Sequence, residues 1–347
     1  MIPTIQEPTT SGSNQASLQK TMITKPKTLA ISLTCALALA TTSRAEEGGS
    51  AHYTPGTTAS FIDAFPGQPG GLAVLNYFTY YDAKAPVSRT LEFGGLLTAN
   101  AHATAYADTF VGIYQAPWNV LGGGLAFGAA VPYVWMEVKG QAQRIQPDGT
   151  AGPVFSARDT ANGIGDMTLI PFMLGWTNIL PDLKLDARLS IFVPTGEYEK
   201  GRLANVGKNY WSFEPGLMAS WLSGKLGTEA SLFAGVDFNT KNSATDYLSG
   251  TSLHLDATLA QHLPFAGGFI GVGANAFYYQ QITGDSGFGA RLGAFEGRTI
   301  GVGPALSYVR PIGKTTQLLA ELKWLPELDV DKRLKGDFVW FKLGILF

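Results

Sequence analysis

Two-residue alternation of apolar and polar side chains runs through most of the chain after residue 46 and constrains the fold more than any other feature. Between Leu183 and Val193 the odd positions are apolar, and the even positions include Lys184, Asp186 and Arg188. The segment from Thr251 to Leu263 repeats this pattern. Strict alternation indicates β-strands with one apolar face, whereas an amphipathic helix repeats every three to four residues. The sequence therefore predicts an all-β fold.

Strand and loop lengths separate a membrane barrel from a soluble β-sandwich, which also alternates. The predicted strands have about ten residues or more, which is long for a globular sheet and suits a tilted strand that crosses a membrane. Short turns and long polar loops alternate, as is typical of outer-membrane β-barrels. The short turns are predicted at 177–182, 223–225, 264–267 and 311–314, and the long loops at 139–162, 195–210, 239–250, 283–297 and 326–336.

The chain ends inside a predicted strand whose apolar positions alternate up to the terminal Phe347. A last strand that finishes in phenylalanine resembles the signal through which outer-membrane barrels are assembled, so we expect the barrel assembly machinery to be a partner. Such a strand ends in the periplasm, and the long loops then all lie outside the cell. The remaining alternative is an ordinary buried edge strand.

Counting back from this strand gives a transmembrane antiparallel β-barrel over residues 72–347 with about twelve strands, within a range of ten to fourteen because residues 89–97 also have strand character. Aromatic side chains near the strand ends are expected to face the membrane interfaces, namely Tyr80, Tyr81, Trp135, Trp176, Trp324 and Trp340. The predicted strands are 72–82, 103–115, 121–138, 164–176, 183–193, 211–222, 226–238, 251–263, 268–281, 298–310, 315–325 and 337–347.

The first residues form an export signal. Residues 1–21 are a polar upstream extension, with Met22 as an alternative start, and residues 22–45 are predicted as a signal peptide that is cleaved after Ala45. Their apolar core is shorter than the roughly 20 residues that a membrane-spanning helix needs. Cys35 is the only cysteine and lies in this core, so the mature chain has no thiol for disulfides, metal sites or catalysis.

Composition and motifs exclude several functions. The pI is near 6.1 and the sequence has no cluster of basic residues, so the chain lacks the positive charge with which nucleic-acid-binding proteins bind phosphates. None of the four histidines forms a helical pair of metal ligands, so the sequence predicts no metal, no cofactor and no catalytic residue. A hydrolase built around His254 and Asp256 is the alternative, but polar residues that face a barrel lumen need no catalytic role.

The polar faces of the strands predict a lumen of mixed charge in which opposite charges pair across neighbouring strands, instead of one sign that would select ions. The predicted lumen-lining residues are Lys184, Asp186, Arg188, Glu214, Glu229, Asp237, His254, Asp256, Glu321 and Lys323, with Lys342 on the last strand.

Residues 46–71 differ from the rest because Pro and Gly interrupt any strand pattern. We predict that this segment is a periplasmic or lumenal plug that enters from the periplasmic side and gates the barrel, with Phe61, Ile62 and Phe65 making the contacts. A mobile tail is the alternative.

Several loop and strand-end motifs resemble the outer-membrane family named for the meta-pathway of phenol degradation. Lys332 departs from the pattern, which has Asn there. The matching pieces are His52–Gly56, Gly165-Asp166, Pro194–Tyr198, Asn209–Pro215, Ala244–Tyr247, Ser249-Gly250, Tyr279–Gln281, Asp285–Gly287, Gly303–Tyr308, Arg333 and Gly336-Asp337. They cover nearly all of the mature chain.

This resemblance implies a transporter β-barrel, and it places the matching polar residues around the outer mouth. They are either ligand-binding residues, since Tyr stacks on aromatic solutes and amides bond hydroxyl groups, or residues that fold the loops over the mouth. These candidates are Asn209, Tyr210, Asp246, Tyr247, Gln280, Gln281 and Asp285.

Together these observations predict a channel in the Gram-negative outer membrane that takes up small hydrophobic or aromatic compounds by passive diffusion, with outer-membrane lipid and the solute as its partners. The alternatives are a structural or adhesive barrel without transport and, with less support, an outer-membrane hydrolase.

Overall fold

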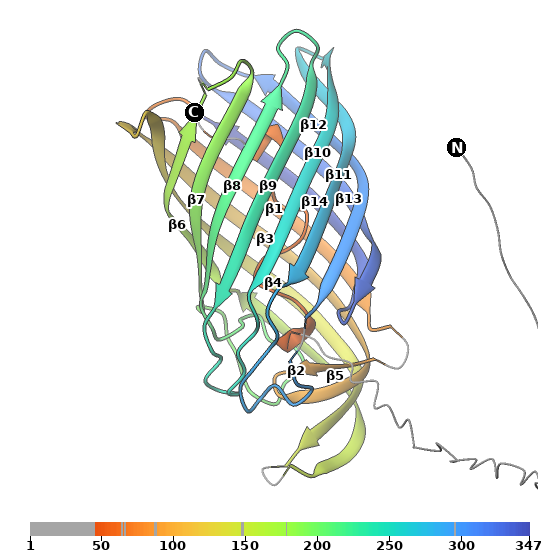
Figure 1. Ribbon diagram of the computed structural model, residues 1–347. Coiled ribbons are helices and arrows are strands. Elements are labelled where there is room, and N and C mark those ends of the chain that lie inside the picture. The colour runs from red at the N-terminus through yellow and green to blue at the C-terminus, as the bar shows by residue number, and fades with distance from the viewer. Residues whose placement is uncertain are drawn as a thin grey trace, which may run out of the picture. The chain divides into compact units, whose positions relative to one another are not determined.

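The described part of the chain forms one β-barrel in the computed structural model, which describes residues 46–63, 65, 67–86, 89–146, 149–177, 179–294 and 296–347. Twelve antiparallel strands form a closed ring (Figure 1), which confirms the predicted fold class. The ring closes because β1 (Leu72–Lys84) pairs with both β14 (Lys335–Leu346) and β3 (Leu96–Val120). Closure pairs the two edges that an open sheet would expose to lipid.

The other ring strands follow one another around the barrel in chain order. Each predicted strand overlaps one strand of the ring, and the largest differences are the extended loop ends of β3, β4 and β13. These strands are β4 (Gly123–Ile145), β6 (Met167–Trp176), β7 (Leu183–Val193), β8 (Ser212–Leu222), β9 (Thr228–Asn239), β10 (Ser252–Phe265), β11 (Gly268–Gln281), β12 (Arg298–Pro311) and β13 (Gln317–Asp331).

Short turns and the C-terminus lie at one end of the barrel, here called the turn end, and the longer connections lie at the other, the loop end (Figure 1). The long connections at 194–211, 240–251 and 282–297 agree closely with the predicted loops. By the rule for outer-membrane barrels the turn end faces the periplasm. Phe347 lies at this end, where its amide donates to the carbonyl of Leu72.

Two predicted loops are instead largely strand. Residues 139–162 were expected as a long loop, but β4 continues to Ile145 and pairs with β5 (Ala151–Ile164) in a hairpin beyond the ring. Residues 326–336 are likewise shortened to a tight turn by the ends of β13 and β14. A further short strand, β2 (Thr90–Phe93), pairs with the start of β3. Above the membrane both faces of a strand meet water, so the apolar alternation that marks the spanning strands is lost there.

Alternate side chains face the lumen and the outer surface. On β8, Leu217 is 64% exposed and Met218 is 3% exposed. On β14, Leu343 is 44% exposed and Lys342 is 1% exposed. The apolar side chains at these positions therefore meet lipid while Met218 and Lys342 lie inside, as the alternation predicts.

The same alternation corrects the predicted aromatic girdle. Trp135 and Trp324 are exposed on the outside. Tyr81 and Trp340 instead face the lumen, where Tyr81 stacks on Phe338 and the Trp340 indole donates to a backbone carbonyl. Tyr80 and Tyr81 are consecutive in one strand, so they cannot both face the membrane.

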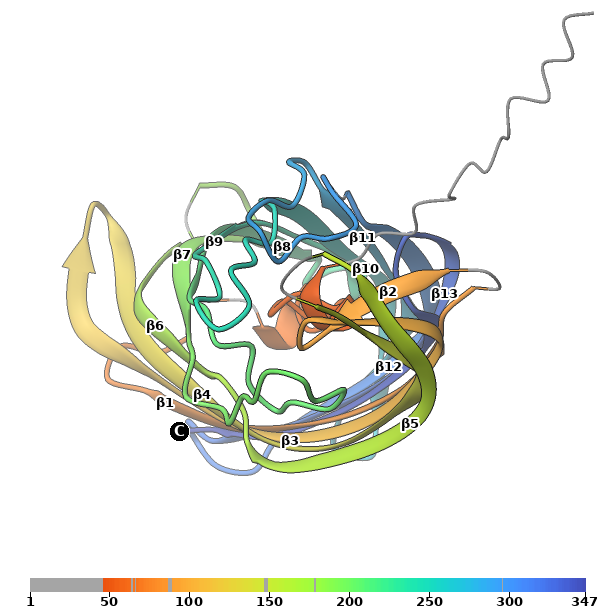
Figure 2. The same ribbon diagram turned by 90° about the horizontal axis from the view of Figure 1, so that it is seen from below.

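The described residues between 46 and 71 thread the interior of the ring (Figure 2). At the loop end Glu46 forms an ion pair with Arg333, and at the turn end Gly71 lies against the carbonyl of Phe347. The segment contains two short 3₁₀ turns, η1 (Glu47–Gly49) and η2 (Phe61–Asp63). The predicted upstream extension (1–21) and signal peptide (22–45) lie outside the described residues.

No helix in the described part of the chain has the length and apolar character that a membrane-spanning helix needs.

Candidate functional site

The lumen has two unlike halves, and the charged half holds the N-terminal segment. Lys342 contacts both Asp63 at 2.9 Å and Glu321 at 3.1 Å, while Lys323 contacts Glu321 at 3.1 Å. Lys323 also donates to the backbone carbonyl of Gly56. Opposite charges therefore neutralise one another across the wall and the segment, as the mixed lumen predicts.

The predicted lumen residues lie inside the barrel, all of them buried except the half-buried Lys184. Asp186 and Arg188 pair at 2.8 Å, and Glu229 pairs with His262 at 2.7 Å. Because such buried charges are paired, they leave no continuous stripe of one sign along this half of the lumen.

Two lumenal carboxylates hold the N-terminal segment through hydrogen bonds. Asp256 accepts hydrogen bonds from the Tyr53 hydroxyl, from the amide of Gly56 and from the Thr58 hydroxyl. Glu229 accepts the amide of Phe61 at 2.7 Å. These bonds satisfy backbone groups that no strand partner reaches, so the segment has one defined path through the barrel.

At the loop end the first residues of the segment bind the outer loops. Glu46 bonds Arg333 and the Tyr279 hydroxyl, and Glu47 accepts from Tyr198 at 2.7 Å and Asn242 at 2.8 Å. Burial raises the pKa of Glu47. The segment and the loops therefore close the loop end together.

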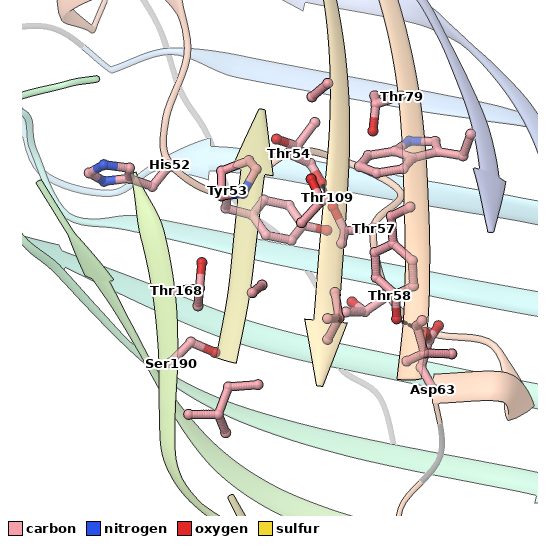
Figure 3. A pocket seen from close by; sticks show the side chains of 18 of the residues that line it. His52, Tyr53, Thr54, Thr57, Thr58, Asp63, Thr79, Thr109, Thr168 and Ser190 are labelled. Atoms are coloured by element: carbon pink, nitrogen blue, oxygen red, sulfur yellow. Dashed lines mark hydrogen bonds between the residues drawn. The ribbon is translucent and has the colours of Figure 1, made fainter. Parts of the chain in front are cut away.

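The other half of the lumen is mostly apolar and borders a cavity of about 810 Å³ (Figure 3). The cavity lining also includes charged side chains, among them Asp63, Lys184 and Arg188. Its wall is formed chiefly by β1, β3, β4, β6 and β7, and the N-terminal segment forms the facing side. The stripe on β3 consists of small and apolar side chains, with hydroxyl groups from Thr79, Thr109 and Thr168 around it. This β3 stripe contains Ala103, Ala105, Ala107, Thr109, Val111 and Ile113.

The cavity extends along the barrel. Leu72 and Phe347 line it at the turn end, and Phe93 and Leu334 line it at the loop end. The alternation rule, which assigned ionic side chains to the interior, is therefore wrong for this half. On β3 both faces are largely uncharged, so the sequence pattern alone does not show which one borders the lumen.

All three predicted plug contacts line this cavity. Ile62 packs against Leu75 and Val111, and Phe65 packs with Met173. Phe61 meets the edge of the His262 ring at 4.6 Å between centroids. The segment thus narrows the lumen at these points, while its role as a gate stays a prediction.

The predicted mouth residues contact one another or neighbouring residues instead of lining the cavity. Tyr247 and Gln281 both donate to Asp285, and the Asn209 amide donates to Asn242 at 2.6 Å. Tyr210 is buried against His52, Gln280 donates to the backbone of Gln281, and Asp246 pairs with Lys241 at 2.6 Å. This geometry favours the alternative that these residues fold the loops over the mouth.

Asp285 and Asp246 differ in how their surroundings shift their pKa. Burial raises the pKa of its carboxyl to about 7, against the hydrogen bonds from Tyr247 and Gly250. Asp246 behaves in the opposite way, because the hydrogen bond from Lys241 lowers its pKa. One buried loop carboxyl therefore titrates near neutral pH.

The alternative of a hydrolase built around His254 and Asp256 gains no support from the geometry around His254. His254 lies beside Glu214 and Asp237, and in the described part of the chain no hydroxyl group hydrogen bonds to either ring nitrogen. The pair of a nucleophilic serine and a histidine base that a hydrolase needs is therefore not present at His254.

Sequence reasoning missed several residues that position this site. Asp63, Glu46 and Glu47 lie in an irregular segment without periodicity, and Arg333 lies in a tight turn. The only sequence signal of Asp63, Glu46 and Glu47 was charge within a segment otherwise rich in small residues, and that of Arg333 was its match to the family pattern.

A family model and several solved structures are similar to this chain. The model of a family described as "Putative MetA-pathway of phenol degradation" matches residues 86–343. The COG4313 outer membrane channel from Pseudomonas putida F1 is similar in structure, with a TM-score of 0.57 and 14% identity over 85% of this chain and 100% of that chain. The beta domain of the Bordetella autotransporter Brka matches with a TM-score of 0.46 and 13% identity, over 80% of this chain and 99% of that one. No curated relative matches the sequence significantly.

Proposed function

The chain belongs to the family of the MetA-pathway of phenol degradation and is an outer-membrane channel-like β-barrel, and from this premise we propose that it admits small hydrophobic or aromatic compounds by passive diffusion. The observation that carries this proposal is the apolar cavity between the N-terminal segment and the β3 stripe. Concave, mainly apolar cavities with a few polar groups are typical of small-molecule sites.

The lining of the cavity matches the chemistry of an aromatic solute. Tyr77, Tyr81 and Phe338 offer ring faces and edges, which contribute attraction beyond the burial of apolar area. Threonine hydroxyl groups at 79, 109 and 168 (Figure 3) can donate to or accept from a phenolic hydroxyl. Along the apolar wall of this cavity, a sugar or an ion would lose hydration without equivalent replacement.

The N-terminal segment sets the width of the path. Removing residues 46–70 takes away one whole side of the cavity together with Asp63, the partner of Lys342. We therefore expect a chain without these residues to show a larger single-channel conductance in planar bilayers. An unchanged, narrow conductance would count against a constricting role for the segment.

Uptake of an apolar fluorescent probe tests the proposal directly. 1-N-phenylnaphthylamine is held back by an intact outer membrane and fluoresces once it enters the membranes beneath. Cells that produce the protein should take it up faster than cells with an empty vector, while uptake of a sugar of similar mass should not change. Equal rates for the probe in the two strains, with the barrel present and folded, would exclude this function and favour the adhesive alternative.

A further inference from the structure

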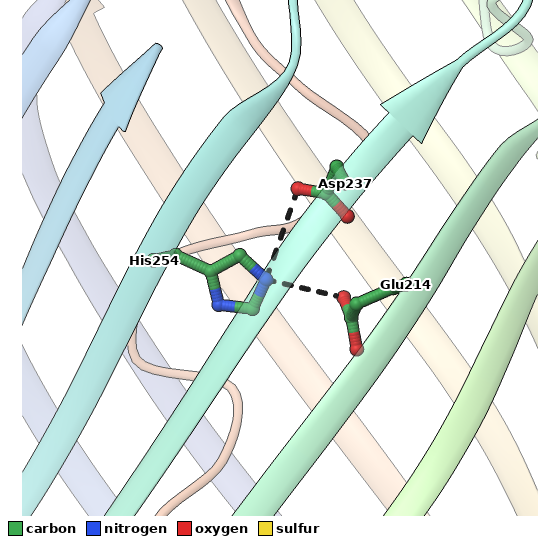
Figure 4. Close-up of side chains that lie close together, drawn as sticks. All are labelled: Glu214, Asp237 and His254. Carbon is green, nitrogen blue, oxygen red and sulfur yellow. Dashed lines mark ion pairs between the residues drawn. The ribbon is translucent and has the colours of Figure 1, made fainter. Parts of the chain in front are cut away.

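Three lumenal side chains from adjacent strands converge on one point near the loop end (Figure 4). Glu214 is on β8, Asp237 is on β9 and His254 is on β10. The Nε2 atom of His254 lies 3.4 Å from Glu214 Oε2 and 3.7 Å from Asp237 Oδ2. None of the three side chains forms the hydrogen bonds that hold the N-terminal segment to Asp256 and Glu229.

Strand register brings the three together. Ser252 pairs with Asp237, so His254 stands two residues further on the same lumenal face. The residue directly opposite His254 is Gly235, where a Cβ atom would overlap the imidazole ring. The glycine lets the ring lie across β9 toward the two carboxylates. A search for ligands at helical spacing could not find this cluster, because its members come from three strands.

The cluster is buried and incompletely satisfied. Glu214, Asp237 and His254 are 4%, 1% and 0% exposed. Within the described residues, the two ring nitrogens of His254 and the Oδ1 atom of Asp237 have no hydrogen-bond partner. Two buried carboxylates face one imidazole that bonds neither of them well, and such groups normally pair fully or coordinate a metal.

The distances from His254 to the two carboxylates suit a metal ion, and the ligand atoms of the three residues all lie within 4.8 Å of one another. Atoms bound to zinc at 2.0–2.1 Å in tetrahedral geometry lie about 3.4 Å apart, close to the two distances from His254. Serine hydroxyl groups orient both carboxylates, from Ser190 to Glu214 at 3.1 Å and from Ser252 to Asp237 at 3.0 Å. The Tyr53 ring stacks on the imidazole at 3.5 Å between centroids and limits its rotation. Hydrogen bonds to ligating groups of this kind are usual around metal sites.

We propose that Glu214, Asp237 and His254 bind one divalent transition-metal ion of the zinc class inside the barrel wall. An imidazole nitrogen with two carboxylate oxygens favours zinc or cobalt over calcium and magnesium, which prefer oxygen ligands alone. The ion joins β8, β9 and β10 directly beneath Tyr53, so its binding also stiffens the wall against which the N-terminal segment lies.

A second buried pair provides the matched control. His262 bonds Glu229 at 2.7 Å, and the other oxygen of Glu229 accepts the amide of Phe61. This histidine and carboxylate lie in the same wall, on β10 and β9, but they are at hydrogen-bond distance and satisfy each other. If buried histidines stabilised the barrel without a metal, substitutions of His254 and of His262 would have similar effects.

The experiment uses the whole barrel, produced without a polyhistidine tag, stripped with a chelator and folded in detergent. We expect the protein to retain about one Zn²⁺ per chain after dialysis and to give the intense visible absorption of tetrahedral Co²⁺ when cobalt is supplied instead. Ca²⁺ should not compete. D237N, E214Q and H254Q should lose the stoichiometric metal and the cobalt spectrum, whereas H262Q should keep both.

Gel mobility of unheated samples identifies the variants that fold. D237N and E214Q are nearly isosteric with the native residues, so at least one folded variant is expected to report on binding. Zinc should raise the temperature at which the native protein and H262Q lose their folded mobility, and it should leave D237N unaffected. Absence of stoichiometric metal in the native barrel, or unchanged binding in folded D237N and E214Q, would overturn the proposal.

Discussion

At the scale of single residues, burial decides what each charge does. Lys342 is 1% exposed and contacts Asp63 and Glu321, whereas Lys241 pairs with Asp246 on an exposed loop. An exposed ion pair contributes little, because water solvates both charges well. Removing one partner from a buried pair leaves the other charge unpaired and is strongly destabilising.

We therefore expect K342M to lower the stability of the barrel by roughly 3–5 kcal/mol, because two carboxylates lose their common partner. The temperature at which an unheated sample shifts to its denatured gel mobility measures this loss. K241M is the control and should leave that temperature unchanged. Equal behaviour of the two variants would show that the network around Lys342 does not hold the segment.

Whether a side chain faces lipid or the lumen also differs from one residue to the next, and two tryptophans test this assignment. Trp324 is 52% exposed on the outside, and Trp340 is 4% exposed in the lumen. In vesicles with brominated lipids, which quench nearby indoles, W324F should remove part of the quenched fluorescence and W340F should remove almost none. A reversed result would mean that these strands are turned inside out.

At the scale of elements, the loop end combines strand extensions with interlocked loops. The hairpin of β4 and β5 rises beyond the ring, and its outer part pairs within itself, with Gln143 opposite Val154. The loops at 240–251 and 282–297 are joined through Asp285, which accepts the amide of Gly250. The outer part of the hairpin should tolerate shortening, whereas the two joined loops should respond to the protonation of Asp285.

Replacing residues 144–153 with a two-residue Asn-Gly turn should leave the barrel intact, because the flanking pair of Gln143 and Val154 can be closed by a type I′ turn. Unheated gel mobility and its midpoint temperature check this. Loss of the folded band would show that the hairpin is needed for the ring itself.

The loops joined through Asp285 should loosen as the pH rises. Burial raises the pKa of this carboxyl to about 7, so the folded loops hold a proton that the unfolded chain releases near pH 4. The stabilising effect is complete below pH 4 and is lost as the pH passes through 7. Hydrogen exchange of the loop amides, corrected for its intrinsic rate, should therefore report decreasing protection from pH 4 to 7.

D285N, which cannot ionise, should make loop protection independent of pH over this range. D246N is the control, since the pKa of Asp246 is lowered by Lys241 and this group stays ionised throughout. A pH dependence that persists in D285N would assign the effect to another group.

At the scale of the whole molecule, the two halves of the lumen have different roles. The charged half binds the N-terminal segment through Asp256, Glu229 and Lys342, and the apolar half borders the cavity. Such a division gives an apolar solute a path that does not require breaking the ion pairs.

Filling the cavity should therefore slow uptake without unfolding the barrel. A107W places an indole in the β3 stripe, and we expect it to reduce the rate of phenylnaphthylamine uptake several-fold. Y106W alters the neighbouring residue on the outer face, where Tyr106 is 42% exposed, and should have no effect. If A107W folds and transports as well as Y106W, the solute does not pass along this stripe.

Alternation in the sequence was sufficient for the architecture. Long strands with apolar side chains at every second position, joined by short and long connections in turn, indicate a barrel with one face in lipid, so the strands, their approximate number and the uneven ends of the barrel followed from local pattern. The charged lumen of β7 to β10 followed for the same reason. The family motifs also pointed correctly to the outer-membrane channel class.

Only the tertiary structure decided what the lumen contains. The path of residues 46–71 depends on single bonds to Asp256 and Glu229, which lie about 170 or more positions away in the chain. The convergence of Glu214, Asp237 and His254 depends on the register of three strands. Local sequence carries the period of a strand, but it does not carry the long-range pairings that close a barrel, and those pairings determine which side chains meet inside it.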